Sequence, residues 1–431
     1  MISKKIKIIS SIVMISLIAA PIFFRKKNIG MEAVDSVNKS GIKSSLFNIK
    51  SGNVVFFKFR FKNEGTLQNT PETHGISVIV SNLLFNRIDG LTPEETYAKL
   101  TKLGIYGLSV NAFADDFEVS FFTTKDKIND ALAFLSLAFK NPTFSNGDLE
   151  DAKTRYPNIP NQDLSSPRDL MRDKLLSMLY TNDAYGMNNT GTAQVISGIT
   201  SDHVMSFIRN RLHSRNLQVT IAGGVSKSEL NTYINALFDG LLDNQEKRAN
   251  RSLSPTLSEN RVAVVNKPEM GNVAIVVSGI RLDDLSDVER AAAFVIADTI
   301  FHNDIGDFAN GLRERGIANR VTTSVIRRSL SNAIVFVVYM EKDDVEDYNT
   351  YLEERFAHYS KNMKLQDFEK IRERLALLSN NGFTSLDDID KYLESVRLPY
   401  NDITPEIFQK IASMFFSKSL RKTVVYMNET E

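Results

Sequence analysis

The chain lacks cysteine altogether and contains only five histidines in 431 residues. The absence of cysteine excludes disulfides, thiolate metal sites and cysteine nucleophiles. An imidazole metal site has few candidates, because the histidines are limited to His74, His203, His213, His302 and His358. The chain also carries no net charge, since its 52 basic residues match its 52 acidic residues. No basic stripe suggests a nucleic acid partner, and no acidic tail suggests a disordered binding arm.

The N-terminus has the pattern of a targeting segment. Lysines precede an apolar run over residues 8–24, and a basic cluster ending at Lys27 follows. A basic start with a short apolar core is typical of export signals. We therefore expect residues 1–27 to be a cleaved signal peptide or an uncleaved anchor that enters the membrane through residues 8–24. The expected location is the bacterial periplasm, with the protein either free or anchored to the inner membrane.

The rest of the chain is long enough for two domains with sizeable cores. Both halves show strand-like and helix-like hydrophobic patterns in the same order. The first half has these patterns at residues 53–61, 75–85, 92–103, 106–112, 117–123 and 128–139, and the second half at residues 272–277, 287–301, 312–317 and 332–340.

This order predicts an α+β fold of two homologous domains, each a mostly antiparallel sheet with helices packed on one face. The N-terminal domain is expected over residues 42–242, and the C-terminal domain over residues 260–428. Residues 243–259 are rich in polar residues and include Pro255, so we interpret them as the linker.

The most informative stretch is the helix expected from about Gly75 to Phe85. Its apolar residues recur at three- and four-residue steps, which indicates that one face belongs to a core. The stretch closely resembles the signature helix of the insulinase and mitochondrial-processing-type zinc peptidases, which are pitrilysin-type, inverzincin enzymes. In that family a Gly-Leu-Ala lead-in precedes H-x-x-E-H, and Met-Leu-Phe follows. The lead-in is matched by Gly75-Ile76-Ser77 and the exit by Leu83-Leu84-Phe85.

Between these matching ends, the catalytic motif is missing. Val78 stands at the first histidine of the motif, Ser81 at the glutamate and Asn82 at the second histidine. The family's third zinc ligand is a glutamate on a later helix. Alignment of Phe144 and Pro167 with the family's flanking positions places Ile159 there, between two prolines that would kink a helix.

These replacements remove the chemistry that the family implies. A catalytic zinc needs three protein ligands and an open position for water. Valine and isoleucine offer no donor atom, and a neutral asparagine carbonyl is a poor substitute for imidazole. Ser81 cannot act as the general base, because its hydroxyl ionises far above working pH. We therefore expect no catalytic residue, no metal and no cofactor in this chain.

His74 lies four residues before Val78 and is the one imidazole near the motif. A lone histidine at a helix entrance is more often a capping or surface residue than a ligand. We therefore interpret His74 as structural.

The second half offers one positive functional feature. In related peptidases a Leu-Arg-Glu … Gly-Leu-x-Tyr segment supplies an arginine and a tyrosine that hold the substrate backbone. Arg313 matches the arginine, and Asn319 falls on the tyrosine position in a segment that is one residue shorter. The resemblance implies that both residues bind substrate. The alternative is that Arg313 caps or pairs locally, for example with Glu314 or Asp307.

Some members of the family work as pairs, in which one subunit brings the metal and the other brings shape and substrate contacts. The resemblance therefore implies a subunit, inactive on its own, that completes a peptide-binding chamber with a catalytic zinc peptidase partner. Its ligand would be a peptide or an unfolded polypeptide. One alternative is a stand-alone peptide-binding or structural scaffold. Another is an active zinc metalloendopeptidase with a divergent site.

Overall fold

The computed structural model describes residues 32–37, 42–48, 53–155, 174–181, 184–186, 191–238, 258–283, 285–304, 306–326, 328, 330–362, 368–369 and 399–429. These residues fall into two compact units. Within the described part, residues 32–155 and 191–238 form the first unit, and residues 174–186 and 258–429 form the second.

The first unit contains a six-stranded sheet in the order β1-β2-β6-β3-β5-β4, which is antiparallel except where β2 pairs with β6. The strands are β1 (Glu32–Val37), β2 (Lys43–Asn48), β3 (Val54–Phe61), β4 (Tyr106–Ala112), β5 (Phe117–Thr124) and β6 (Leu217–Gly223). Its helices are α2 (Ile76–Leu83), α3 (Pro93–Lys102), α4 (Ile128–Lys140), α5 (Asn146–Arg155), α8 (Ala193–Ser197), α9 (Ser201–Arg211) and α10 (Lys227–Phe238).

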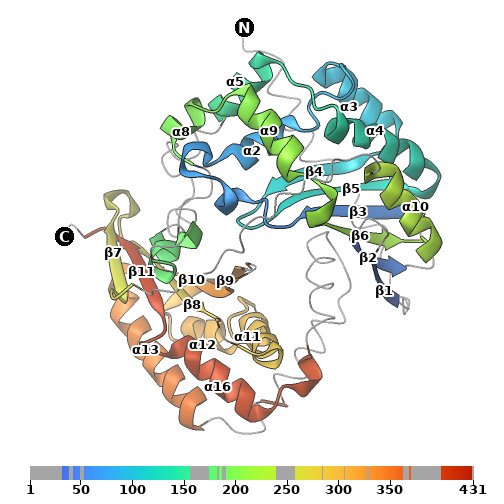
Figure 1. The fold of residues 1–431 in the computed structure, drawn as a ribbon. Helices are drawn as coiled ribbons and strands as arrows, with labels where there is room; N and C mark the ends of the chain where they lie inside the picture. Colours follow the sequence, from blue (N-terminus) through green and yellow to red (C-terminus); the bar gives the residue numbers. More distant parts are fainter. Residues whose placement is uncertain are drawn as a thin grey trace. The chain divides into compact units, whose positions relative to one another are not determined.

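Alternation along the strands explains why the helices cover one face of this sheet. In β3, Val55, Phe57, Phe59 and Phe61 are all at most 2% exposed and belong to the same apolar core as the inner faces of α2, α4, α9 and α10. Successive side chains of a strand point to opposite faces, so this set defines the helix-covered side. Figure 1 shows these helices gathered along the sheet.

The second unit contains a five-stranded sheet in the order β7-β11-β8-β10-β9, in which only β7 and β11 run parallel among the described pairs. The strands are β7 (Val262–Asn266), β8 (Val273–Arg281), β9 (Ala318–Ile326), β10 (Ala333–Glu341) and β11 (Lys422–Met427). Its helices are α11 (Asp287–Thr299), α12 (Asp307–Glu314), α13 (Val345–Ala357) and α16 (Pro405–Phe416).

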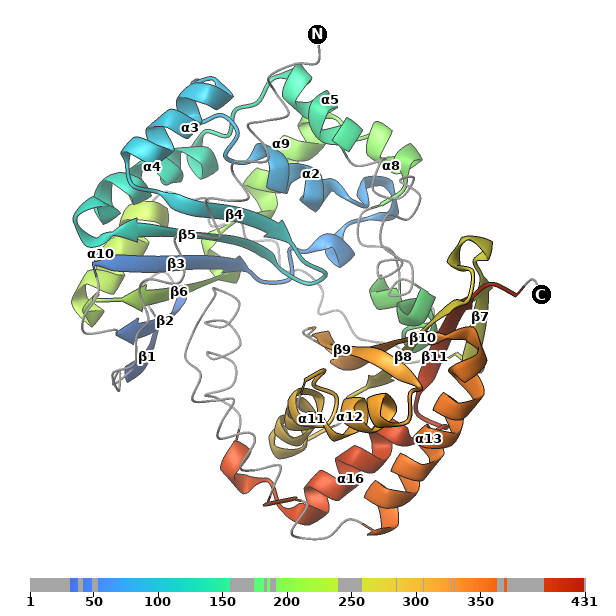
Figure 2. The ribbon, with the colours of Figure 1, turned by 180° about the vertical axis from the view of Figure 1, so that it is seen from behind.

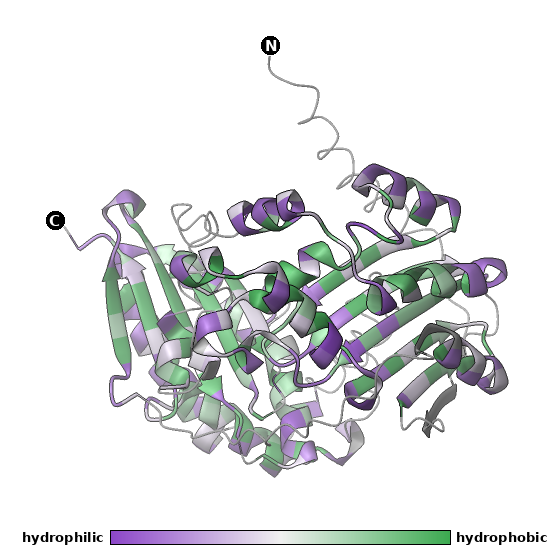
Figure 3. Ribbon diagram, turned by 45° about the horizontal axis from the view of Figure 1, so that its top comes forward, coloured by the Kyte–Doolittle hydropathy of each residue, from purple (hydrophilic) through white to green (hydrophobic). Residues whose placement is uncertain are grey.

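The predicted α+β architecture of two sheets with packed helices is therefore confirmed. The strands of both sheets are largely hydrophobic, and the helices carry alternating hydrophobic and hydrophilic bands (Figure 3). In the part of the chain that the structure describes, every helix is too short or too polar to cross a bilayer. Residues 1–27 lie outside the described residues, as does most of the expected linker at 243–259.

An ion pair joins the start of α11 to α16. Glu289 accepts hydrogen bonds from the backbone N–H and hydroxyl of Ser286, and Lys410 of α16 lies 2.5 Å from its carboxylate. The hydrogen bond from Lys410, with those from Ser286, lowers the pKa of Glu289 to about 2. A carboxyl with a lowered pKa stabilises the fold above its unfolded pKa of about 4.3, and this contribution is lost as the pH falls toward 2.

Replacing Glu289 by glutamine should therefore lower the melting temperature more at about pH 6 than at about pH 3, because glutamine does not titrate. The measurement is thermal unfolding of the wild type and Glu289→Gln at both pH values. A difference in melting temperature that stays constant between the two pH values would contradict the assigned ion pair.

Candidate functional site

The signature helix begins at a glycine that the backbone requires. Gly75 has φ +96°, in the left-handed region that favours glycine, and its carbonyl accepts hydrogen bonds from Val78 N and Ile79 N. The helix then runs from Ile76 to Leu83 and buries Ile76, Ile79, Val80 and Leu83 in the core of the first unit. The core face that the sequence predicted for this stretch is therefore confirmed.

The three motif positions lie together on the outer side of α2. Val78 and Ser81 are half-buried, and Asn82 is exposed. The Ser81 hydroxyl donates to the Val78 carbonyl at 2.7 Å, and the Asn82 amide donates to the same carbonyl at 2.9 Å. Both polar side chains thus bond back to the preceding turn of their own helix. The face that carries the catalytic motif in the resembling family here presents a hydrocarbon and two side chains that bond to the backbone.

Ile159, the expected third ligand position, lies outside the described residues. These break off at Arg155, at the end of α5, and resume at residue 174. Among the residues that the structure does describe, no group of three or more histidine, aspartate or glutamate side chains could hold a metal ion. The assignment of Val78, Ser81, Asn82 and Ile159 as a degenerate metal site stays a prediction.

His74 lies in the turn before α2, at the end of the short 3-10 helix Pro71–Thr73. Its side chain is half-buried. The backbone at Gly191 approaches it so closely that a Cβ there would lie 2.4 Å from the His74 carbonyl oxygen. His74 is thus placed in a tightly packed turn.

The entrance to α2 is fixed by a buried ion pair that the sequence did not indicate. Arg211, at the end of α9, lies 2.6 Å from Glu64, and their side chains are only 10% and 3% exposed. Arg211 also donates to Asn69 at 2.5 Å, and Asn69 donates to Ser77 of α2 at 3.1 Å. This chain of contacts ties α9 and the loop after β3 to the first turn of α2.

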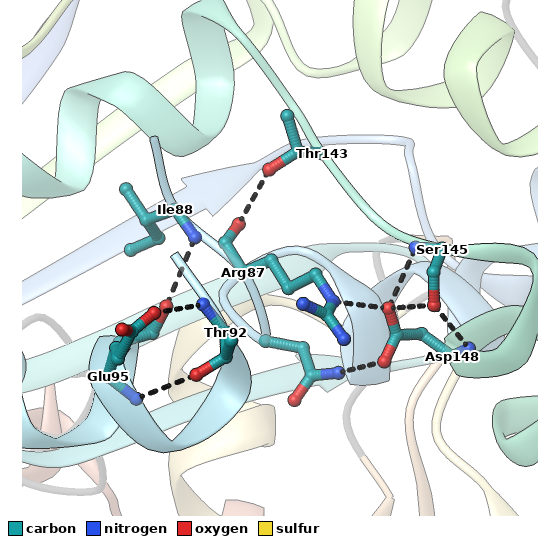
Figure 4. A network of polar contacts seen from close by, with 9 residues as sticks. Arg87, Ile88, Thr92, Glu95, Thr143, Ser145 and Asp148 are labelled. Atoms are coloured by element: carbon teal, nitrogen blue, oxygen red, sulfur yellow. Dashed lines mark hydrogen bonds and ion pairs between the residues drawn. The ribbon is translucent and has the colours of Figure 1, made fainter. Parts of the chain in front are cut away.

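The exit of α2 is fixed by a second network, shown in Figure 4. Arg87 donates to Asp148 of α5 at 2.6 Å, and Asp148 also accepts from the backbone and hydroxyl of Ser145. Burial by itself would raise the pKa of the Asp148 carboxyl. The hydrogen bonds from Arg87 and Ser145 outweigh this effect and lower its pKa. The network holds the segment after α2 against the start of α5, the helix that leads toward position 159.

An open sheet edge lies beside α2. The helix contacts β4, which is the last strand of its sheet and pairs only with β5 among the described strands. Phe113 N–H bonds back to Asp116 across the hairpin. Because backbone N–H groups alternate in direction along a strand, those of Val110 and Ala112 point to the open side. An edge of this kind can accept an added strand.

Side chains along β4 give this edge an uncharged outer face. Register with β5 places Tyr106, Ser109 and Asn111 on the face away from the helices, opposite Phe122, Ser120 and Glu118 respectively. Tyr106 is 55% exposed, which leaves an aromatic ring available at one end of the edge.

The two candidate substrate contacts lie in the second unit. Arg313, in α12, is half-buried and donates to the side-chain carbonyl of Asn310 one turn earlier. This is a local contact, as the alternative interpretation expected, although with a different residue; Asp307 instead accepts from Arg355. Asn319 is exposed near the start of β9. Whether Arg313 and Asn319 contact substrate stays a prediction.

The edge at β9 differs from the edge at β4. Val321 N–H, in β9, donates to the side-chain oxygen of Asn303 at 3.0 Å. A side chain of the same unit therefore already accepts a hydrogen bond from a backbone N–H group of this edge strand. Of these two edges, β4 is therefore the better candidate to accept a peptide strand.

Comparison with known proteins gives one family and many similar folds. Residues 198–375 match the family model described as the peptidase M16 inactive domain. The chain is 22% identical over 182 residues to an uncharacterized zinc protease of Rickettsia felis, and 20% identical over 211 residues to one of Rickettsia bellii. These matches span 41% and 48% of this chain, and 43% and 50% of the relatives, so the chain covers half of their length at most.

Solved structures resemble the whole described fold. The peptidase M16 inactive domain from Pseudomonas fluorescens has a TM-score of 0.79 with 14% identity, over 93% of this chain and 98% of that chain. A protease from Helicobacter pylori has a TM-score of 0.76 with 14% identity, over 92% and 100%. The periplasmic protease PqqL from Escherichia coli has a TM-score of 0.70 with 14% identity, over 94% and 48%. At this identity the likeness shows the fold alone. Family match, relatives and fold together confirm the resemblance to the M16-type zinc peptidases that was seen in the sequence.

Proposed function

We propose that this chain is a non-catalytic, peptidase-like subunit that completes a peptide-binding chamber with a separate zinc peptidase subunit. The observation that carries the proposal is the contrast within α2. The helix has the glycine start and the buried face that the resemblance implies, whereas Val78 and Asn82 stand where the resemblance places the two histidines. A helix of this form that lacks side chains able to bind zinc supports a role in peptide binding rather than in hydrolysis.

The proposed peptide site is the open edge of β4. An extended peptide that adds to a sheet edge gains main-chain hydrogen bonds, and neighbouring side chains select its sequence. Val110 and Ala112 would supply donors, and Tyr106 would contact a side chain of the peptide. Arg313 and Asn319 remain the proposed contacts from the second unit, with Arg313 the leading one.

We also propose that the protein is exported. The basic and apolar pattern of residues 1–27 supports this location, and one structure of the same fold is described as a periplasmic protease. Residues 8–24 would be either removed with a signal peptide or kept as an anchor in the inner membrane.

The test is affinity purification of the tagged full-length chain from its native host, followed by a peptidase assay. We expect a zinc-bearing relative with an intact H-x-x-E-H to co-purify in stoichiometric amount. Peptide cleavage should require the partner and should increase when this chain is added to it. A stable monomer with no such partner would contradict the proposal and would favour a stand-alone peptide-binding or structural scaffold.

The β4 edge can be tested separately with a backbone variant. Ala112→Pro removes one outward N–H donor, whereas Ala112→Ser keeps it. A net hydrogen bond contributes about 0.5–1.5 kcal/mol, so Ala112→Pro should weaken binding roughly two- to tenfold. The measurement is fluorescence anisotropy with labelled, reduced and alkylated α-lactalbumin as the unfolded probe. Equal affinities for the two variants would contradict strand addition at this edge.

A further inference from the structure

Residues 174–186 precede the expected linker in the sequence, yet they lie in the second unit. Residues 174–179 form a short helix that lies beside β8 and β10 in both views (Figures 1 and 2). The sequence-based domain boundaries placed this segment in the N-terminal domain. Its contacts show what holds it in the second unit.

The segment packs directly on the backbone of the central strand β8. A Cβ on Gly279 would lie 2.8 Å from Leu175 Cδ2 and 3.0 Å from Leu179 Cδ1. The core under the helices contains Ala274, Val276 and Ile280 of β8. Position 279 therefore faces the opposite side of the sheet. Glycine at this position lets the short helix approach the sheet more closely than any larger residue would allow.

Polar contacts fix the end of the same short helix. Arg281 of β8 donates to the Leu179 carbonyl at 3.1 Å, and its guanidinium lies 5.0 Å from the centre of the Tyr180 ring. The Tyr180 hydroxyl lies 3.1 Å from the Ser331 hydroxyl in a buried contact. Because a buried hydroxyl is costly without a partner, this contact favours one fixed position of the segment.

A second tyrosine extends the attachment. The Tyr185 hydroxyl accepts a hydrogen bond from Leu330 N–H at 3.3 Å, and the Arg328 guanidinium lies 4.5 Å from the centre of the Tyr185 ring. Tyr180 and Tyr185 are 1% and 0% exposed and pack edge to face. Two buried tyrosines, each with an arginine guanidinium near its ring, are features of a specific docking contact.

We propose that the face of the second sheet opposite its helices is a docking surface for residues 174–186, and that this contact holds the two halves of the chain together. A cut within residues 243–257 leaves residues 174–186 on the N-terminal fragment and their docking surface on the C-terminal fragment. The two fragments therefore stay associated without the linker. This property does not depend on the proposed peptidase partner.

The experiment uses the full chain with a site for a specific protease inserted within residues 243–257. After cleavage, we expect both fragments to elute together in size-exclusion chromatography and to separate only in denaturant. Gly279→Leu should cause the fragments to separate, because the new side chain takes the space of Leu175 and Leu179. Val273→Leu is the matched control on the same strand and face, since Val273 is 46% exposed, and its fragments should stay together.

A second variant covers the possibility that Gly279→Leu fails to fold. Leu175→Ala with Leu179→Ala changes only the docked segment, and circular dichroism of the uncut chain reports its folding. Separation of its fragments supports the proposal. Wild-type fragments that separate after cleavage, or folded variants whose fragments still elute together, would overturn it.

Discussion

Arg211→Ala is expected to destabilise the first unit by about 3–5 kcal/mol, because it removes one partner of a buried ion pair with Glu64. The Glu64 side chain is only 3% exposed, so its charge is held away from bulk water. Arg211 also holds Asn69, which bonds to Ser77 of α2. The variant should therefore loosen the entrance of the signature helix as well as weaken the unit.

The measurement is urea unfolding, followed by hydrogen exchange of the α2 amides. Lys125→Ala is the control, because the side chains of Lys125 and its partner Glu229 are 46% and 36% exposed, and such pairs contribute about 0.5 kcal/mol or less. Arg211→Met combined with Glu64→Leu should recover part of the loss, since no buried charge remains. Equal losses in Arg211→Ala and Lys125→Ala would contradict the buried ion pair.

Phe301→Ala is expected to cost the second unit about 3–5 kcal/mol, the usual range for a buried phenylalanine. The Phe301 ring is fully buried and lies 4.6 Å from the ring of Phe336 and 4.9 Å from that of Phe308. It also stacks on Phe415 and Phe416 of α16 at 5.5 Å. Truncation would open a cavity between the sheet and two helices, which the surrounding rings can fill only in part.

Phe356→Ala is the matched control, because Phe356 is 38% exposed on α13. Its loss should stay below about 1 kcal/mol, as for other surface substitutions. Thermal unfolding of both variants gives the comparison. A Phe301→Ala variant as stable as Phe356→Ala would contradict the assigned core of the second unit.

Local signals in the sequence predicted local structure well. The hydrophobic pattern over residues 92–103 predicted an element there, and the structure has α3, which begins with a complete capping box between Thr92 and Glu95. Capping depends on residues only three positions apart, so it is visible without the fold. The buried face of α2 was also predicted, because the three- and four-residue spacing of its apolar residues can be seen within one helix.

Contacts between distant segments could not be predicted in this way. Glu64 and Arg211 are far apart in the sequence, and neither residue has a pattern that indicates the other. The docking of residues 174–186 was missed because chain order assigned them to the first half, whereas Gly279 accepts them on the second sheet. The sequence also did not predict that Arg313 donates to Asn310, since this contact depends on how α12 places the two side chains.

We propose that the signature helix does not support zinc chemistry. The most direct measurement is the zinc content of the purified full-length chain together with its peptidase activity, with the zinc-bearing partner as positive control. We predict far less than one zinc per chain and no peptide cleavage by this chain alone. One zinc per chain, with cleavage that a chelator abolishes and added zinc restores, would contradict the account.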